Sequence, residues 1–215
     1  MNHSTQTAGK PSNSGSKRLF SNPLLEKLTR THISIPVSIF IVFSFALLGM
    51  AYVTANLPFL TILALFTSGL LLFTLIEYLM HRFIYHMNAR SVRLRRLQYL
   101  MHGVHHDYPK DKSRLAMPPI VSVLIAALLL GAVYLILKEY TFAFLPGFVL
   151  GYAAYLFVHY IVHAYRPPQN MFRVLWVHHS IHHYKDPARA FGVSSPLWDY
   201  IFGTMPENKK RESSG

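Results

Sequence analysis

The sequence predicts an all-α membrane protein whose four transmembrane helices form two hairpins. Three observations predict this fold. Of the 215 residues, 52% are apolar and only 14% are charged, whereas about 25% are charged in typical globular domains. Four apolar stretches each approach the ~20 residues that a helix needs to cross ~30 Å of hydrocarbon. Nearly all positive charges also fall on one side of the membrane that these stretches define.

The amino-terminal residues predict two short segments outside the membrane. Residues 1–18 are rich in Ser, Gly, Asn and Thr, so we expect a disordered polar tail. Asn22 followed by Pro23 is typical of a helix start. Residues 19–31 are therefore expected to form an amphipathic segment that lies on the membrane surface.

The integral-membrane domain is predicted to cover residues 32–204, followed by a polar tail over 205–215. Its spans are expected at 33–55, 59–80, 118–137 and 142–165. Only residues 56–58 separate the first two spans, and only residues 138–141 separate the last two. Each pair is therefore expected to form a helical hairpin with almost no loop outside the membrane.

Charge placement predicts the orientation. Of 21 Lys and Arg residues, 20 lie before the first span, between the second and third, or after the fourth, and only Lys138 lies in a short loop. The positive-inside rule places that side, and both termini, in the cytoplasm. We expect a bacterial inner membrane, or the endoplasmic reticulum membrane in a eukaryote. The net charge of +12 is then explained by topology, and nucleic acid is not an expected partner.

Histidine is the unusual feature of the composition. The chain has 13 His and no Cys, which excludes thiolate-held metals and disulfides. Ten of the histidines form four groups, HRFIYH (81–86), HGVHH (102–106), HYIVH (159–163) and HSIHH (179–183), all at cytoplasmic ends of spans or in the adjoining segments. Because residues i, i+3 and i+4 share a helix face, each triplet is expected to converge on one point. His81 and His86 are about 140° apart on an ideal helix, so this pair needs a helix end or a bend.

The groups predict a cytoplasmic helical cap that holds a dinuclear metal site. Ten imidazoles are too many for one ion, so two metals with about five ligands each are expected. The predicted ligands are His81, His86, His102, His105, His106, His159, His163, His179, His182 and His183. The other histidines, His3, His32 and His178, are not expected to bind metal.

Two acids are candidates for orienting the ligands. Glu77 is the only acid inside a span and lies four residues before His81. An intramembrane carboxylate needs a partner, so we expect it to accept a hydrogen bond from His81. Asp107, next to the first triplet, either supports a ligand or caps a loop. We also expect residues 191–204 to form a wall of the site, with Trp198 and Tyr200 either in that wall or at the membrane interface.

The histidine motifs resemble the sterol desaturase and fatty acid hydroxylase superfamily. The order HX4H, HX2HH, HX3H, HX2HH around membrane hairpins matches that superfamily. The flanks EYLMHRFIYH (77–86), LMHGVHHDYPKDKSRLAMPP (100–119), VHYIVHAYRPP (158–168) and HSIHHYKDPARAFGVSSPLWDYIFGT (179–204) are similar to its fatty acid 2-hydroxylase branch. The resemblance covers residues 70–204. Unlike the eukaryotic members, this sequence shows no fused cytochrome-type haem domain.

The resemblance implies a chemistry for the site. It implies two iron ions held by the ten histidines named above, although zinc can replace iron at imidazole sites. It also implies dioxygen-dependent hydroxylation of the acyl carbon beside the carbonyl in a membrane lipid, commonly an N-acylated sphingoid. Electrons are then expected from a separate electron-donor protein.

Other functions stay open from the sequence. A sterol or carotenoid hydroxylase or desaturase belongs to the same superfamily. A membrane di-zinc hydrolase needs a carboxylate base near the metal, and acids are scarce near these histidines. A metal transporter is expected to place its ligands near the bilayer midplane, whereas these ten lie at or beyond the ends of the spans.

Overall fold

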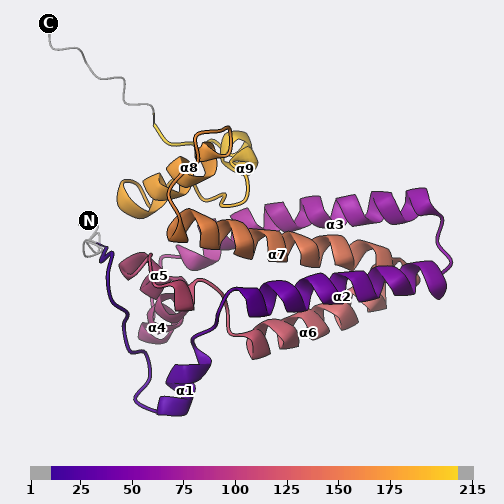
Figure 1. Ribbon diagram of the computed structural model, residues 1–215, viewed down its shortest axis with the longest axis horizontal. Coiled ribbons are helices and arrows are strands. Elements are labelled where there is room, and N and C mark those ends of the chain that lie inside the picture. Colours follow the sequence, from indigo (N-terminus) through magenta and orange to yellow (C-terminus); the bar gives the residue numbers. More distant parts are fainter. Residues whose placement is uncertain (1–10, 208–215) are drawn as a thin grey trace, which may run out of the picture.

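The computed structural model describes residues 11–207, and all regular structure within that range is helical (Figure 1). Four long helices lie side by side, and the short helices gather at one end of this bundle. The long helices are α2 (Ser34–Val53), α3 (Phe59–Leu79), α6 (Pro119–Leu137) and α7 (Thr141–Ala164). The short ones are α1 (Pro23–Leu28), α4 (Val92–Gln98), α5 (Val104–Asp107), α8 (Arg173–Tyr184) and α9 (Leu197–Ile201).

The apolar stretches form helices close to their predicted bounds. Three segments of the described chain are long and apolar enough to cross a membrane: Ser34–Val53, Phe59–Tyr85 and Lys112–Ala164. The third contains both α6 and α7, joined by a 3₁₀ turn over Lys138–Tyr140. The predicted helix start at Asn22 is confirmed, since its side chain accepts hydrogen bonds from the amides of Leu24 and Leu25 at 2.9 and 3.2 Å.

Helix α7 packs closely against α3 because glycines remove the side chains between them. A Cβ atom on Gly147 would lie 1.9 Å from the carbonyl oxygen of Phe66, and one on Gly69 would lie 2.1 Å from that of Phe144. Gly151, one turn after Gly147, accommodates the ring of Phe73 in the same way. Small residues spaced by four let membrane helices approach in this manner. This contact fixes the histidines at the end of α7 relative to those that follow α3.

Two π-helical turns interrupt the regular helices at the cap. Helix α3 continues directly as a π-helix over Met80–Tyr85, and a second π-helical turn over Tyr99–Gly103 joins α4 to α5. Such turns are rare and are often found at functional sites. Each of these two contains one predicted metal ligand, His81 or His102.

The segment before α1 differs from the expected disordered tail. Residues 1–10 lie outside the described residues, as does most of the predicted tail over 205–215. Residues 11–18 instead run along the cap and form hydrogen bonds with it. The amide of Ser12 donates to the carbonyl oxygen of Asp107 at 2.8 Å, and Arg114 donates to the carbonyl oxygen of Lys17 at 3.0 Å. The leucines of α1 are exposed. The location of α1 on the membrane surface stays a prediction.

Candidate metal centre

The fold brings the ten predicted ligands together in two groups of five. Each histidine of a group offers one ring nitrogen as a possible ligand atom, and the five nitrogens of a group all lie within 4.8 Å of one another. Cluster A consists of His81, His86, His102, His106 and His182. Cluster B consists of His105, His159, His163, His179 and His183. The rings of the two clusters are in contact, since those of His106 and His183 stack with their centroids 4.2 Å apart.

The spacing of the imidazole nitrogens fits a metal ion in each cluster. Neighbouring Nε2 atoms within a cluster lie 2.7–3.1 Å apart. Two nitrogen ligands at the usual ~2.1 Å from an ion, and at right angles to each other, would be ~3 Å apart. Both clusters therefore have the donor type and the spacing of a preformed coordination shell.

The prediction that each triplet converges on one point is wrong. His102 and His106 belong to cluster A, but His105 belongs to cluster B; His179 and His183 belong to cluster B, but His182 belongs to cluster A. On a helix, residue i+4 lies about 40° to one side of residue i, and residue i+3 lies about 60° to the other. The i and i+4 rings therefore share a cluster, while the i+3 ring faces the neighbouring one. Each triplet thereby bridges the two metal positions.

The π-helical turn explains how His81 and His86 meet. The amide of His86 donates to the carbonyl oxygen of His81, five residues earlier, at 3.3 Å. In this wider turn, residues i and i+5 are stacked, and the two ring centroids are 5.1 Å apart. The sequence indicated that this pair needs a bend or a helix end, and a π-helical turn at the end of α3 meets that need.

Burial keeps the ligands in the neutral form that binds metal. Burial lowers the pKa of His182 to about 3, with a further contribution from His86. Burial also lowers the pKa of His86 to about 4. Burial, reinforced by neighbouring imidazoles, holds the pKa well below 6.5 at His102, His105, His106, His179 and His183. These rings are neutral at physiological pH, as metal ligation requires.

Backbone carbonyls orient two rings of cluster A. The Nδ1 atom of His81 donates to the carbonyl oxygen of Phe191, and that of His182 donates to the carbonyl oxygen of Arg189 at 2.8 Å. A hydrogen bond at Nδ1 leaves Nε2 free to face the metal. Phe191 also contacts the cluster, with its ring centroid 5.8 Å from that of His86. The segment that follows α8 therefore forms one wall of cluster A, as predicted for residues 191–204.

Two buried carboxylates hold this wall in place. Asp199, which is 0% exposed, accepts hydrogen bonds from the amides of Phe191 and Gly192 at 2.9 and 2.7 Å. It also accepts from Nε2 of His178 at 2.9 Å and from the hydroxyl of Thr204 at 2.7 Å. His178 belongs to neither cluster and has a structural partner in Asp199. Asp199 is not among the residues predicted from the sequence, where its only signal is its place in the predicted wall.

The predicted hydrogen bond between Glu77 and His81 is wrong. Glu77 instead accepts from the amides of Val193 and Ser194 at 2.8 and 2.9 Å, and from the Ser194 hydroxyl. Because His81 donates to Phe191, two residues before Val193, Glu77 supports the ligand through the wall rather than directly.

Two further candidates from the sequence also have structural partners. Asp107 accepts a hydrogen bond from the hydroxyl of Tyr99 at 2.7 Å, so it fastens the π-helical turn. Trp198 donates to Thr74 at 3.0 Å, which ties α9 to α3, while Tyr200 is 78% exposed.

Two apolar cavities extend from the membrane helices to the clusters. One, of about 330 Å³, is lined by Phe40, Phe73 and Phe148 from the spans and reaches His81 of cluster A. The other, of about 460 Å³, reaches His102, His105 and His159 and so touches both clusters. The two cavities share Tyr85, Tyr152 and Tyr155 in their linings. An apolar chain within the bundle can thus approach the metal positions.

A family comparison agrees with this geometry. The model of the fatty acid hydroxylase family matches residues 66–204, which is more than half of the chain. The chain belongs to the fatty acid hydroxylase family. The matched region contains all ten clustered histidines, most of α3, all of α6 and α7, and the wall that Asp199 organises. As a member of this family the chain is a multi-pass membrane protein.

Individual members of the family are similar over most of this chain. A dihydroceramide fatty acyl 2-hydroxylase of Arabidopsis thaliana is 33% identical over 196 residues, which are 88% of this chain and 80% of the plant protein. A ceramide very long chain fatty acid hydroxylase of Schizosaccharomyces pombe is 36% identical over 195 residues, which are 89% of this chain and 55% of the yeast protein. The chain thus spans about half of the yeast relative.

A solved structure supports the fold of the hydroxylase domain. The structure of full-length scs7p, in which only the hydroxylase domain is visible, matches with a TM-score of 0.83 at 34% identity. The match covers 92% of this chain and 75% of the other. The helical bundle with its cap is therefore the fold of the hydroxylase domain in that protein.

Proposed function

We propose that this protein is a membrane-bound non-haem di-iron hydroxylase that uses dioxygen to hydroxylate a lipid acyl chain at the carbon beside the carbonyl. The proposed substrate class is an acyl chain in amide linkage to a sphingoid base, as in ceramides. The observation that carries the proposal is the junction of apolar cavities with two adjoining five-histidine clusters. The similarity to a plant dihydroceramide fatty acyl 2-hydroxylase supports the choice of substrate.

The donor set supports iron over zinc as the working metal. Five neutral imidazoles for each ion exceed the four ligands that structural zinc takes, and they leave room for an exogenous ligand. Reduced iron at these positions would supply the dioxygen chemistry that breaks an unactivated C–H bond, which no side chain can do.

The protein's own residues position the substrate and exclude water. Phe40, Phe73 and Phe148 give the membrane end of the smaller cavity an aromatic lining that favours an acyl tail. Tyr85 and Tyr155 lie where the two cavities meet, and their rings face His102 and His159 at centroid distances of 4.9 and 5.5 Å. An extended tail in these cavities would bring the carbons near its carbonyl up to the clusters, away from bulk water.

We further propose four membrane spans, α2, α3, α6 and α7, with the cap and both termini in the cytoplasm. The 20 Lys and Arg residues that precede, follow or separate the two hairpins support this orientation. It places the clusters at the cytoplasmic surface of the membrane, where a donor protein can supply electrons while the lipid remains in the bilayer. A bacterial inner membrane is the proposed location.

Lipid mass spectrometry tests the proposed function. Cells would express the wild type or a His105→Ala, His182→Ala variant, which removes one ligand from each cluster, and would be grown in ¹⁸O₂. The expected result is one ¹⁸O atom, located by fragmentation beside the acyl carbonyl, only in cells with the wild type. An ¹⁸O atom on a sterol or carotenoid would assign the protein to another branch of the superfamily. Product that forms without dioxygen would favour a hydrolase and contradict the proposal.

A further inference from the structure

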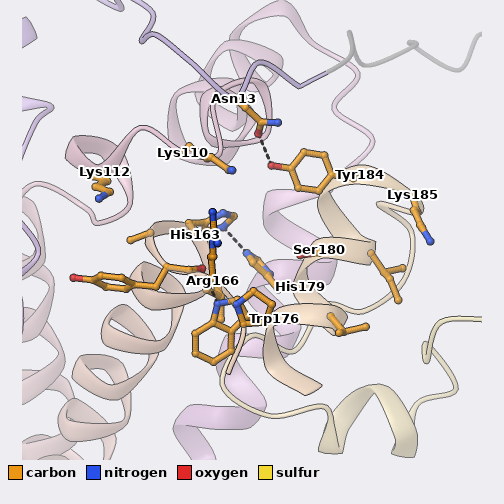
Figure 2. A pocket seen from close by; sticks show the side chains of 16 residues that line it. Asn13, Lys110, Lys112, His163, Arg166, Trp176, His179, Ser180, Tyr184 and Lys185 are labelled. Atoms are coloured by element: carbon orange, nitrogen blue, oxygen red, sulfur yellow. Dashed lines mark hydrogen bonds between the residues drawn. The ribbon is translucent and has the colours of Figure 1, made fainter. Parts of the chain in front are cut away.

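Cluster B is open to a second hollow, which differs from the two apolar cavities in the basic side chains that surround it. A cleft of about 750 Å³ lies between the end of α7, helix α8 and the loop that carries Lys110 and Lys112 (Figure 2). Part of its wall is formed by the rings of His163 and His179. The Nε2 atoms of these two rings are 2.7 Å apart. The cleft shares no lining residue with either apolar cavity. Cluster B can therefore be approached by two separate routes.

The rim of this cleft is cationic and exposed. Its lining includes no acidic residue but four exposed cations, Lys110, Lys112, Arg166 and Lys185. Within residues 11–207 none of the four forms an ion pair. Tyr184 donates a hydrogen bond to Asn13 at 2.8 Å across the upper part of the cleft, so that the amino-terminal segment borders it (Figure 2). Four unneutralised charges around one hollow create a field that attracts an anionic partner.

The proposed reaction requires a partner that supplies electrons. Hydroxylation converts one C–H bond, one O₂, two electrons and two protons into one C–OH group and one water, so the electrons must come from a reductant. The apolar cavities lie among the membrane helices and suit the acyl tail, whereas the basic side chains around the cleft suit an acidic protein surface. Since two ligand rings of cluster B lie in the cleft wall, a carrier bound there would have a short path to the metal.

We propose that the cationic cleft beside His163 and His179 is the docking site for an acidic electron-carrier protein. The inference rests on the proposed function. The carrier would lose one electron in each docking event, and two events would supply one hydroxylation. Lys110, Lys112, Arg166 and Lys185 would bring the carrier to this face by charge complementarity, which acts mainly on the association rate and falls with ionic strength.

Binding measurements on the metal-loaded protein test this proposal without relying on turnover. The protein would be placed in nanodiscs of zwitterionic phosphatidylcholine and titrated with three acidic carriers, a plant-type ferredoxin, a flavodoxin and a soluble cytochrome b5 domain. A basic c-type cytochrome would serve as the negative probe. We expect at least one acidic carrier to bind, with an affinity that falls as salt is added, and the basic cytochrome not to bind.

Charge-reversal variants locate the docking site. Lys110→Glu with Lys185→Glu should weaken binding of the acidic carrier by about tenfold or more at low salt and flatten its salt dependence. Arg93→Glu with Arg96→Glu makes the same charge change on exposed residues of α4 outside the cleft and should change the affinity by less than about twofold. Metal content must be equal in all samples, and the neutral Lys110→Gln, Lys185→Gln variant should give an intermediate loss.

Several outcomes would overturn the proposal. Equal weakening of carrier binding in the cleft and α4 variants would mean that the carrier responds only to the net charge of the protein. Binding of none of the acidic carriers by the wild type would exclude the proposed partner class. If the cleft variants keep carrier affinity but lose affinity for glycerol phosphate or phosphatidylglycerol, the cleft is a lipid headgroup site instead.

Chemical reduction separates this inference from the proposed function. Dithionite needs no docking site, so cleft variants that are reduced with dithionite without oxygen, freed of excess reductant and then exposed to O₂ should hydroxylate lipid in a single turnover as well as the wild type does. If the dithionite-driven wild type makes no hydroxylated lipid while the carrier still binds at the cleft, the proposed function fails and the docking site stands. If dithionite-driven hydroxylation occurs but the cleft variants bind the carrier normally, only the docking proposal fails.

Discussion

Cluster A and cluster B have the same number of imidazoles but are held in different ways. In cluster A, His81 and His182 donate to carbonyl oxygens of the segment after α8, and the buried Asp199 and Glu77 fix that segment. In cluster B, His159 alone has such a partner within residues 11–207, the carbonyl oxygen of Leu115 at 3.2 Å. The buried Nδ1 atoms of His105, His179 and His183 have no hydrogen-bond partner among the described residues.

The difference shows two ways to position a metal ligand. Cluster A depends on an irregular segment whose amides are held by carboxylates. Cluster B depends on the packing of regular helices, because the ends of α7 and α8 carry four of its five rings. Changes to the wall should therefore affect cluster A selectively, whereas changes to helix packing should affect both clusters.

Single substitutions of two adjacent histidines on α8 should have the largest effect on metal binding and hydroxylation. His182→Ala should remove the metal of cluster A and His183→Ala that of cluster B, with metal content falling by about half in each and hydroxylation lost in both. Metal analysis by mass spectrometry gives the content, and anomalous diffraction gives the position of the ion that remains. Loss of both ions from either single variant would show that the clusters are not independent.

Asp199→Asn tests the wall of cluster A. The amide retains the shape but removes the charge and one acceptor, leaving donors such as the Gly192 amide unpaired at about 1–3 kcal/mol each. We expect metal affinity at cluster A to fall by about 10–100-fold, as for other groups that orient ligands, with cluster B unchanged. Chelator competition measures both sites. Glu139→Gln, on the exposed turn after α6, is the matched control, and equal loss at both clusters would contradict this account.

Gly147→Ala tests the helix packing that the clusters share. Its Cβ atom would lie 1.9 Å from a carbonyl oxygen of α3, so α3 and α7 must separate. Overpacking of this kind costs about 1–3 kcal/mol, and we expect both clusters to lose affinity together. Thermal unfolding in bicelles and chelator competition provide the measurements. Gly131→Ala on α6, where a Cβ atom meets nothing within 4 Å, should have little effect.

Glu26→Gln should have the smallest effect on stability of these substitutions, and any effect on metal binding should fall on cluster B. Burial raises the pKa of Glu26, but the amides of Leu19 and Phe20, with Arg30 and Arg114, outweigh it and hold the pKa at about 2. Arg114 forms an ion pair with Glu26 and directly precedes Leu115 in the chain. The ion pair therefore supports the carbonyl oxygen of Leu115, which accepts a hydrogen bond from His159.

The pH dependence of this contribution follows from the lowered pKa. A carboxyl whose folded-state pKa lies below 4.5 stabilises the fold above pH 4.5, and that contribution is lost as the pH falls from 4.5 towards 2. Glu26→Gln should therefore lower the melting temperature slightly at pH 7, and the difference from the wild type should vanish near pH 2. A difference that persists at pH 2 would mean that shape rather than charge matters at this position.

The sequence by itself determined the elements and the inventory of ligands. Apolar length is sufficient to predict the four long helices, because hydrocarbon thickness sets the number of residues a span needs. The ten histidines and their division into two sets of about five followed from their number and from their predicted place on one side of the membrane. These are properties of composition and of local pattern, and none of them requires a contact between distant segments.

Only the tertiary structure decided which histidine joins which cluster. Helical periodicity gives the angle between two rings on one helix, but it does not say where the ring of another helix will meet them. The placement of His105 beside His183, of His182 beside His86, and of the wall beside Glu77 all depend on contacts between segments that lie far apart in sequence. Such contacts form only when α3, α7 and α8 pack, because the packing fixes the direction from which each ring reaches a metal.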